Sequence, residues 1–581
     1  MTDKWNPQTT KDPSASHHAP EPTEPRRSAA ERYLQSPVMA KLLKDRGITT
    51  AEEAQKFFAP QLSELHDPFL MRDMKRAVER LNEAMGAKER ILVYGDYDVD
   101  GTTAVALVYK YLSQFYSRID YYIPGRYDDG YGISNRVVDM AAAAGVKLII
   151  ILDCGIKANE EIAYAKSLGI DFIICDHHVA GDELPDAAAI LNPKLETSNY
   201  PFRHLSGCGV GYKLMQAFAM SNGLPTSDLE NYLDLVAVSI AADIVPMVGE
   251  NRIMTFHGLR RLNSNPNIGL RAIMRICGLT GREITISDVI FKIGPRINAS
   301  GRMQSGREAV DLLVSRDSAE AARKAAEIDR YNRDRKELDK QITEEAQAIL
   351  EARGEAVDAK KSIVMYNENW HRGIIGIVAS RLTEVYYKPA VVLTLTNGLA
   401  SGSSRSVQGF DIYSAVESCQ DLLENFGGHT YAVGLSMKPE NIPAFAERFE
   451  RYVAENITPS QLKPTHEIDA DVELDDVNLD MLHFLRRLNP FGPGNQKPVF
   501  RTRGVRDAGT SKVVGRTNEH IKLDLRQGES ERVVSAIAFN QADKFGRIAA
   551  GEPFTVVYTV EENKHHAAGS PIQLLIKEIE F

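Results

Sequence analysis

The stretch "RILVYGDYDVDG" (residues 90–101) joins a short apolar run to three aspartates at alternate positions. The apolar run has the length and composition of a buried strand. Carboxylates as close in sequence as those of Asp96, Asp98 and Asp100 repel one another, so their ionised forms need a compensating positive charge. A cation that prefers oxygen ligands is the obvious candidate. The stretch therefore predicts a strand that ends in part of a metal site.

Apolar runs and segments of helical spacing alternate on either side of this stretch. The expected strands are 90–95, 119–124, 146–153 and 170–176, and the expected helices are 102–116, 135–145 and 158–169. This alternation is typical of a parallel α/β sheet. Such sheets bind ligands at the carboxyl ends of their strands. Because 96–100, Asp153 and 176–178 all come directly after strands, we expect them to share one edge of the sheet.

The whole chain divides into several parts. We expect a disordered tail (1–30), a parallel-sheet α/β domain with a helical lead-in (31–305), a long connecting helix (306–355), a smaller α/β domain (356–458) and a β-barrel domain similar to an OB fold (464–581). The tail is rich in Pro, Ser and Thr. Residues 307–353 contain no Gly or Pro, which predicts a solvent-exposed spacer of about 38 residues and roughly 57 Å. Short alternating strands after residue 466 indicate the barrel.

Composition narrows the class of protein. The chain has 581 residues, too many for one compact core, so two to four domains are expected. No apolar run approaches the ~18 residues of a membrane helix, and the polar N-terminus is not a secretory signal. The five cysteines form no C-x-x-C pair, which argues against disulfides and zinc ribbons and predicts a cytoplasmic protein. With a net charge of −10, nucleic acid could bind only through a local basic groove.

The D-x-D-x-D-G pattern also opens an EF-hand loop, which requires a bidentate glutamate at loop position 12. Counted from Asp96, that position is Leu107, and the pattern follows a strand instead of a helix. The EF-hand is therefore excluded, and a site assembled from several strand ends remains. Its further candidate ligands are Asp153, Asp176, His177, His178 and Asp243.

Several acids and a histidine in one crevice would be prohibitively charged without cations. Two divalent ions would balance them and suit phosphoryl chemistry, in which one ion activates water and both hold the oxygens of an in-line displacement. An imidazole among carboxylates favours Mn²⁺ over Mg²⁺. Each piece alone has an ordinary structural explanation: a single Asp after a strand is most often a helix cap, and Asp243 alone would be structural. The combination favours the metal site.

Four segments resemble the first four motifs of the DHH phosphoesterase family. They are "DYDVDG" (96–101), "LDCGI" (152–156), "CDHH" (175–178) and "AADIVPM" (241–247). Further segments resemble the branch of that family that degrades single-stranded DNA: "GPRINASGRM" (294–303), "WHRGIIGIVASRL" (370–382), "GGH" (427–429) and "RLNPFGPGNQKPVF" (487–500). The resemblance covers about residues 35–581 and implies a DHH domain, a DHHA1 domain and an OB-like domain.

The resemblance also implies roles for particular residues. Asp98, Asp100, Asp153, His177 and Asp243 match the ligands of two divalent cations, Mn²⁺ or Mg²⁺, with Asp153 as a bridge. Asp96 would support or join them. His178 would lie near the scissile phosphate, where it stabilises charge or assists proton transfer, and it joins Asp98 and Asp100 as a catalytic candidate.

A nuclease also needs donors for phosphate. "GPRINASGRM" is expected to form a glycine-flanked loop that offers Arg296, Asn298, Ser300 and Arg302 to phosphate, against the alternative of a structural turn with surface arginines. "SGSSRS" (401–406) offers Ser403 and Arg405. By resemblance, Arg126 belongs to a 5′-phosphate pocket and Gly428 and His429 to the DHHA1 side of the site, although a histidine in a turn is more often structural. In the C-terminal domain, Lys512, Arg516 and Lys522 could add positive charge.

The activity implied by the resemblance is metal-dependent exonuclease degradation of single-stranded DNA from the 5′ end to 5′-mononucleotides, in recombination and repair. The implied partners are single-stranded DNA, a single-strand-binding protein and a helicase, with no membrane, and we expect a monomer. One alternative is a phosphodiesterase of the same family for short oligonucleotides or cyclic dinucleotides, which would leave the β domain without a purpose. Another is a non-catalytic scaffold, which the full set of candidate ligands argues against.

Overall fold

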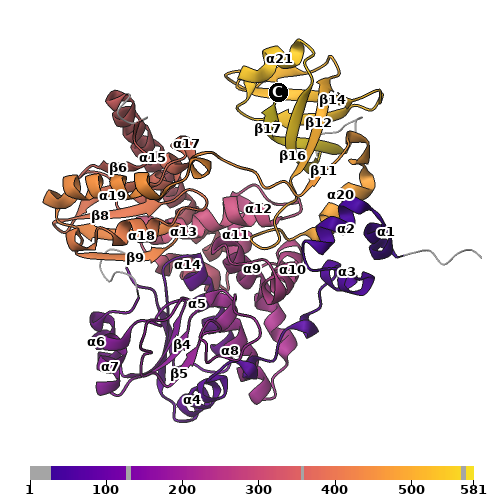
Figure 1. The fold of residues 1–581 in the computed structure, drawn as a ribbon. Coiled ribbons are helices and arrows are strands. Elements are labelled where there is room, and N and C mark those ends of the chain that lie inside the picture. Colours follow the sequence, from indigo (N-terminus) through magenta and orange to yellow (C-terminus); the bar gives the residue numbers. More distant parts are fainter. Residues whose placement is uncertain (1–27, 126–131, 355–358, 564–570) are drawn as a thin grey trace, which may run out of the picture.

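The computed structural model describes residues 28–125, 132–354, 359–563 and 571–581. Figure 1 shows three lobes: the N-terminal α/β domain, the second α/β domain reached through a long helix, and the C-terminal barrel. The expected tail lies outside the described residues except for its end, where α1 (Ala29–Gln35) begins. Among the described residues, no helix combines the length and the apolar character needed to cross a bilayer.

The first sheet is parallel throughout, as the alternation predicts. Its strands, in the order β2-β1-β3-β4-β5, are β2 (Ile119–Tyr122), β1 (Arg90–Gly95), β3 (Val146–Leu152), β4 (Asp171–Cys175) and β5 (Ala189–Leu191). Alternate residues of β3 join two different hydrophobic clusters, Ile149 and Ile151 one and Leu148 and Ile150 the other. From Leu148 to Leu152 the strand is apolar at every position because both of its faces are buried there.

Helices cover both faces of this sheet. One cluster contains α6 (Asn135–Ala143) and α7 (Asn159–Ser167). The other, larger cluster contains α4 (Met74–Gly86), α5 (Val99–Leu112), α8 (Gly207–Ser221), α9 (Leu233–Ala242) and α10 (Gly249–Ser264), followed by α11 (Ile268–Ile276) and α13 (Gly294–Met303). In this layer α9 packs against α5, α8 and α10 (Figure 1).

The expected single connecting helix over 306–355 is wrong in one respect, because it consists of two helices. α14 (Gly306–Val314) ends before Asp317, whose side chain accepts the Glu320 N–H at 2.8 Å and caps α15 (Ser318–Arg353). α15 has 36 residues. One face of it is buried against α11, α13 and α17 (Ile375–Tyr386), so it is more than a solvent-exposed spacer.

The second α/β domain contains a mixed sheet in the order β6-β7-β8-β10-β9. The strands are β6 (Ile363–Tyr366), β7 (Ala390–Thr396), β8 (Leu399–Arg405), β9 (Asn425–His429) and β10 (Ala432–Met437). Only β6 and β7 pair in parallel; the others are antiparallel neighbours. Helices α17, α18 (Ile412–Glu417) and α19 (Ile442–Asn456) pack on it.

The C-terminal domain is a closed barrel of five strands, as expected. The strands are β12 (Phe500–Asp507), β14 (His520–Gln527), β15 (Val534–Ala538), β16 (Phe554–Glu562) and β17 (Ile572–Glu580), and pairing of β12 with β14 closes the barrel. The N-terminal helices α1, α2 (Pro37–Lys44) and α3 (Ala51–Phe58) share one hydrophobic cluster with this barrel and with α20 (Leu479–Leu488). The helical lead-in thus packs on the last domain of the chain.

Candidate metal centre

The three aspartates of the opening stretch lie at the junction of β1 and α5. Asp98 is the N-cap of α5, and its Oδ1 accepts the Gly101 N–H at 3.1 Å. Asp100 therefore lies within the first helical turn. A Cβ on Gly101 would come within 2.6 Å of the Asp96 backbone nitrogen, so only glycine lets the helix begin this close to the strand end.

Asp100 is anchored by the start of α8. Its carboxylate accepts the N–H groups of Gly207 and Cys208 at 2.6 and 2.8 Å and the Ser239 hydroxyl at 2.7 Å. A helix N-terminus favours negative charge through its free N–H groups and its dipole. The side chain is almost fully buried. These three bonds hold the carboxylate rigidly and leave one lone pair, on Oδ2, for a cation.

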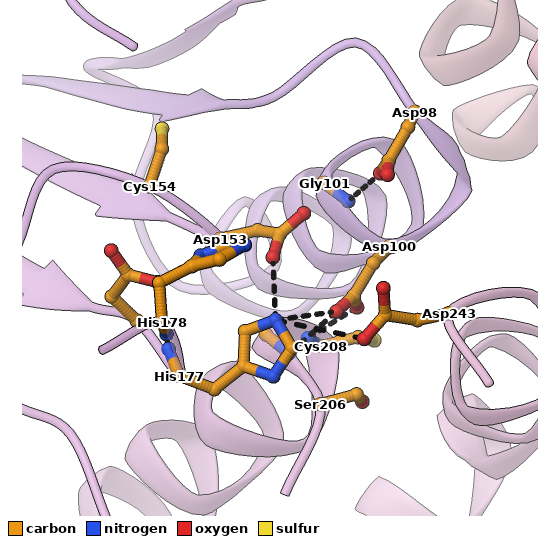
Figure 2. A network of polar contacts seen from close by, with 12 residues as sticks. Asp98, Asp100, Gly101, Asp153, Cys154, His177, His178, Ser206, Cys208 and Asp243 are labelled. Atoms are coloured by element: carbon orange, nitrogen blue, oxygen red, sulfur yellow. Dashed lines mark hydrogen bonds and ion pairs between the residues drawn. The ribbon is translucent and has the colours of Figure 1, made fainter. Parts of the chain in front are cut away.

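His177 lies among three carboxylates that come from three different elements (Figure 2). Its Nε2 is 3.1 Å from Asp153 Oδ1, 3.6 Å from Asp243 Oδ2 and 3.7 Å from Asp100 Oδ2. Asp153 follows β3 with φ at +61°, a left-handed conformation that is uncommon for residues other than glycine. Asp243 is the C-cap of α9. The sequence prediction that these strand and helix ends meet is confirmed.

Asp176 braces the loop that carries both histidines. Its carboxylate accepts N–H groups from Ile156, His177 and His178 at 2.7–3.0 Å, and its Oδ1 lies 2.7 Å from His178 Nδ1. Burial alone would oppose its charge, but the His178 hydrogen bond and charge lower the pKa of Asp176 to about 2. The same contact outweighs burial and raises the pKa of His178. Asp176 thus fixes the direction of the His178 ring.

The ionised forms of the remaining acids are disfavoured unless a cation neutralises them. Burial, followed by repulsion from Asp100, raises the pKa values of Asp98 and Asp153, and it raises that of Asp243 to about 8. Burial lowers the pKa of His177 to about 4, which keeps the imidazole neutral as metal binding requires. The His177 Nε2 lies within ion-pair distance of three carboxylates without forming a well-aligned hydrogen bond to any of them, and its Nδ1 has no hydrogen-bond partner within the described chain. These are the properties of metal ligands.

The donor atoms fall into groups close enough to hold ions. Within each group the donor atoms lie within 4.8 Å of one another; the groups are Asp96, Asp98 and Asp153; Asp100, His177 and Asp243; and Asp153, His177 and His178. The first two groups share no residue, so the site has room for two cations. Mixed oxygen and imidazole donors fit Mn²⁺ and, less well, Mg²⁺.

The expected loop over 294–303 is wrong, because the segment forms α13. Pro295 stands at the start of the helix, where its missing N–H costs nothing. Three of its four candidate phosphate donors have structural partners: Arg296 donates to Asp329 at 2.8 Å, Asn298 accepts the Val99 N–H at 3.1 Å, and Ser300 is buried and donates to Ile297. Asn298 therefore steadies the first turn of α5 beside the aspartates.

The fourth candidate, Arg302, reaches the opposite domain, where its Nη1 donates to the Gly373 carbonyl at 3.0 Å. It lines a cleft of about 990 Å³ between the two α/β domains. The other predicted substrate residues that line this cleft are Ser403, Arg405, Gly428 and His429, and Asp176 and His178 line its far side. Five of the predicted phosphate-binding residues thus line this cleft: Ser403, Arg405, Gly428 and His429 from the second α/β domain, and Arg302 from α13 of the first.

The two predicted phosphate-binding residues of "SGSSRS" are held close together by their strand. Both lie on β8, and Arg405 Nη1 donates to the Ser403 hydroxyl at 2.8 Å. Gly428 has φ at +155°, and a Cβ there would come within 2.7 Å of Val433 Cα. Burial, followed by repulsion from His178, lowers the pKa of His429. The pair Ser403 and Arg405 therefore presents a preformed hydroxyl and guanidinium to the cleft.

Sequence reasoning missed two basic residues of the same cleft, Lys157 and Arg372. Arg372 belongs to the "WHRGIIG" segment, whose basic residue beside a glycine was the available signal. Arg126 lies outside the described residues. In the barrel domain, Lys512 and Lys522 face each other across β13 (Lys512–Val514) and β14; this hairpin carries the expected positive charge.

Comparisons with known proteins agree along most of the chain. Residues 90–240 match the DHH family, N-terminal domain, residues 359–455 the DHHA1 domain and residues 468–578 the RecJ OB domain. The single-stranded-DNA-specific exonuclease RecJ of Bacillus subtilis is 35% identical over 95% of this chain and 69% of its own length. The RecJ of Escherichia coli is 34% identical over 87% of this chain and 89% of its own length. A crystal structure of RecJ with Mn²⁺ from Thermus thermophilus superposes with a TM-score of 0.81 at 27% identity. The match covers 95% of this chain and 77% of the RecJ chain. The chain belongs to the RecJ family of single-stranded-DNA-specific exonucleases.

Proposed function

We propose that this protein is a metal-dependent exonuclease that degrades single-stranded DNA from its 5′ end to 5′-mononucleotides. The observation that carries the proposal is the composition of one cleft. One side of the cleft is lined by Asp176 and His178, next to the acidic metal centre. The other side is lined by Ser403, Arg405 and His429. A phosphodiester with a neighbouring phosphate fits between an acidic wall that holds cations and a wall of phosphate donors.

The two walls divide the chemistry. Divalent cations, Mn²⁺ or Mg²⁺, supply Lewis acidity and a water nucleophile when bound. Asp96, Asp98, Asp100, Asp153, His177 and Asp243 would hold them. His178, with its raised pKa and its ring fixed by Asp176, would stabilise charge on the scissile phosphate or pass a proton to the leaving oxygen.

The opposite wall sets register and direction. Arg405 and Ser403 would bind the terminal 5′-phosphate, with Arg302, Gly428 and His429 along the first nucleotide. A guanidinium and a hydroxyl together favour a phosphate over an uncharged end. With the 5′-phosphate held there, the first phosphodiester lies nearest the metal centre, so each cycle releases one mononucleotide.

The cellular role follows from the substrate. Single-stranded DNA with a free 5′ end arises when a helicase opens a duplex, so we propose a role in recombination and repair with a helicase and a single-strand-binding protein as partners. We further propose that the enzyme acts as a monomer in the cytoplasm.

A time course on an internally labelled single-stranded oligonucleotide tests the proposal. It is run with Mn²⁺, Mg²⁺ or chelator, with duplex and RNA as comparisons and with 5′-phosphate or 5′-hydroxyl ends. Mononucleotides released from the 5′ end, only with metal and only from single strands, are the expected result. Turnover of short oligonucleotides or cyclic dinucleotides without attack on long strands would contradict it.

A further inference from the structure

The segment that follows Asp243 is held from outside its own domain. Residues 244–248 lie between α9 and α10. They contact residues 489–495, the first part of the connection from α20 to β12, which we call the interdomain loop. The Met247 N–H donates to the Pro493 carbonyl at 2.6 Å. An added Cβ on Gly492 would lie 2.9 Å from Met247 Cβ, and one on Gly494 3.1 Å from Val248 Cγ1. The backbones approach this closely because the loop has glycine at both positions.

The held segment is strained where it leaves the metal centre. Ile244 directly follows Asp243 and has φ at +59°, which is rare for a β-branched residue. Its side chain is 64% exposed, so its own packing contributes little to holding that conformation. Such a backbone persists only where its surroundings impose it. Within its own domain, the Pro246 carbonyl accepts from Asn251 Nδ2 at 3.0 Å; the contacts at Met247 and Val248 add a constraint from the C-terminal domain.

A buried cation of α10 shapes the interdomain loop. Arg252 is 3% exposed, and its guanidinium donates to the carbonyls of Leu488, Asn489 and Pro490 at 2.8–3.2 Å. It also stacks on Phe57, with 3.7 Å between the guanidinium carbon and the ring centre. No carboxylate of the described chain forms an ion pair with it. Burial, followed by repulsion from Arg46, lowers its pKa to about 9.

Asn495 completes the loop from the other side. Its side chain is buried, and its Nδ2 donates to the carbonyls of Leu488 and Pro490, both at 2.8 Å. Its Oδ1 accepts from Arg46 Nε, also at 2.8 Å. Arg252 and Asn495 therefore converge on the same two carbonyls at the end of α20. A buried unpaired charge is costly, and its effect here is to fix the shape of a loop that touches the metal-ligand segment.

We propose that Arg252 and Asn495 are positioning residues for the metal centre: through the interdomain loop, the C-terminal domain sets the direction of the Asp243 carboxylate. This inference rests on the proposed role of Asp243 as a metal ligand. It makes the C-terminal domain part of the catalytic apparatus even for substrates too short to contact the barrel.

The sharpest test is Gly492→Ala in the full-length protein. The added methyl displaces Met247 but removes no hydrogen-bonding group. We expect Mn²⁺ binding, measured by calorimetric titration, to weaken about tenfold or more, the usual cost of disturbing a group that orients a metal ligand. Hydrolysis of a trinucleotide at low Mn²⁺ should fall with it and recover at high Mn²⁺. Asp243→Asn shows the effect of losing the ligand itself.

Two controls separate positioning from stability. Gly546→Ala places the same methyl where no atom lies within 4 Å, so Mn²⁺ affinity should stay at the wild-type value. Thr502→Val removes a buried hydroxyl that bonds the Val472 carbonyl at 2.7 Å, and so loosens the barrel away from the interdomain loop. It should lower the melting temperature without changing Mn²⁺ affinity.

Asn495→Ala and Arg252→Lys repeat the measurement if Gly492→Ala does not fold. Lowered melting temperature with unchanged Mn²⁺ affinity in the folded variants would overturn the inference and leave a purely structural link. Failure of the proposed function has a different signature. The wild-type protein would then bind Mn²⁺ and leave single strands intact, while the affinity difference between Gly492→Ala and Gly546→Ala would persist.

Discussion

The Asp176 carboxylate, directly after β4, contacts the His178 ring, and both residues line the cleft. Asp176 Oδ1 lies 2.7 Å from His178 Nδ1, and the same oxygen accepts the His178 backbone N–H at 3.0 Å. A single oxygen therefore orients both the ring and the peptide that carries it. Such a partner is expected to matter for rate almost as much as the ligands themselves.

Asp176→Asn should reduce hydrolysis by about 10–100-fold, because an amide cannot accept from all four donors with a full charge. The measurement is the initial rate on single-stranded DNA at saturating Mn²⁺. Asp182→Asn is the matched control, since Asp182 is exposed in the same connection between β4 and β5. Equal rates in the two variants would show that the brace has no catalytic importance.

Asp98→Ala should abolish hydrolysis while binding of single-stranded DNA largely survives. The structural role of the Asp98 side chain is to cap α5 through the Gly101 N–H, so its loss costs about 1 kcal/mol of helix capping. The hydrolysis rate should fall by more than about 100-fold, which is the largest usual loss when a residue that only orients a metal ligand is removed. Rate and DNA affinity are measured on the same preparation. Near-normal turnover would remove Asp98 from the metal site.

The metal-free protein should become less stable as pH rises from about 5 to 8. The pKa of Asp243 is raised to about 8 in the folded state, mainly by burial, against about 3.9 in an unfolded chain. Between these values the folded state holds a proton that the unfolded state releases, so the free energy of unfolding falls as pH increases.

Melting temperatures in chelator across this pH range measure the effect. Asp243→Asn should make the melting temperature less dependent on pH. Mn²⁺ should raise the melting temperature most at high pH, where no proton competes for the Asp243 carboxylate. A chelated protein whose melting temperature rises steadily up to pH 8 would contradict the assigned protonation.

Arg405→Lys should weaken discrimination between 5′-phosphate and 5′-hydroxyl ends by about tenfold, because an ammonium cannot reproduce the two-pronged guanidinium contact. The measurement is the ratio of kcat/KM for the two ends. Arg296→Lys is the comparison, since Arg296 pairs with Asp329 of α15 at 2.8 Å. That variant should lose stability and keep the ratio. A ratio unaffected by Arg405→Lys would place the terminal phosphate elsewhere.

The order of strands and helices, and the acids at the strand ends, could be read from local pattern. β1, β3 and β4 are mostly apolar, and parallel pairing brings their carboxyl ends together, so Asp153 and His177 had to lie near Asp100. The same local signals failed for 294–303. Its glycines and proline resemble a loop, yet Gly301 serves close packing: a Cβ there would come within 2.5 Å of the Tyr97 carbonyl oxygen.

The sequence by itself determined the parallel sheet, the barrel and the cluster of metal ligands, because each depends on periodicity or on residues close to a strand end. Only the tertiary structure decided which polar residues face the cleft and which are used internally. Arg296 and Arg302 are six positions apart on one helix, yet one pairs with α15 and the other reaches Gly373 of the opposite domain. Likewise, Arg252 meets carbonyls more than 230 residues away. Such pairings follow from how whole elements pack, and no local pattern encodes the partner of a long side chain.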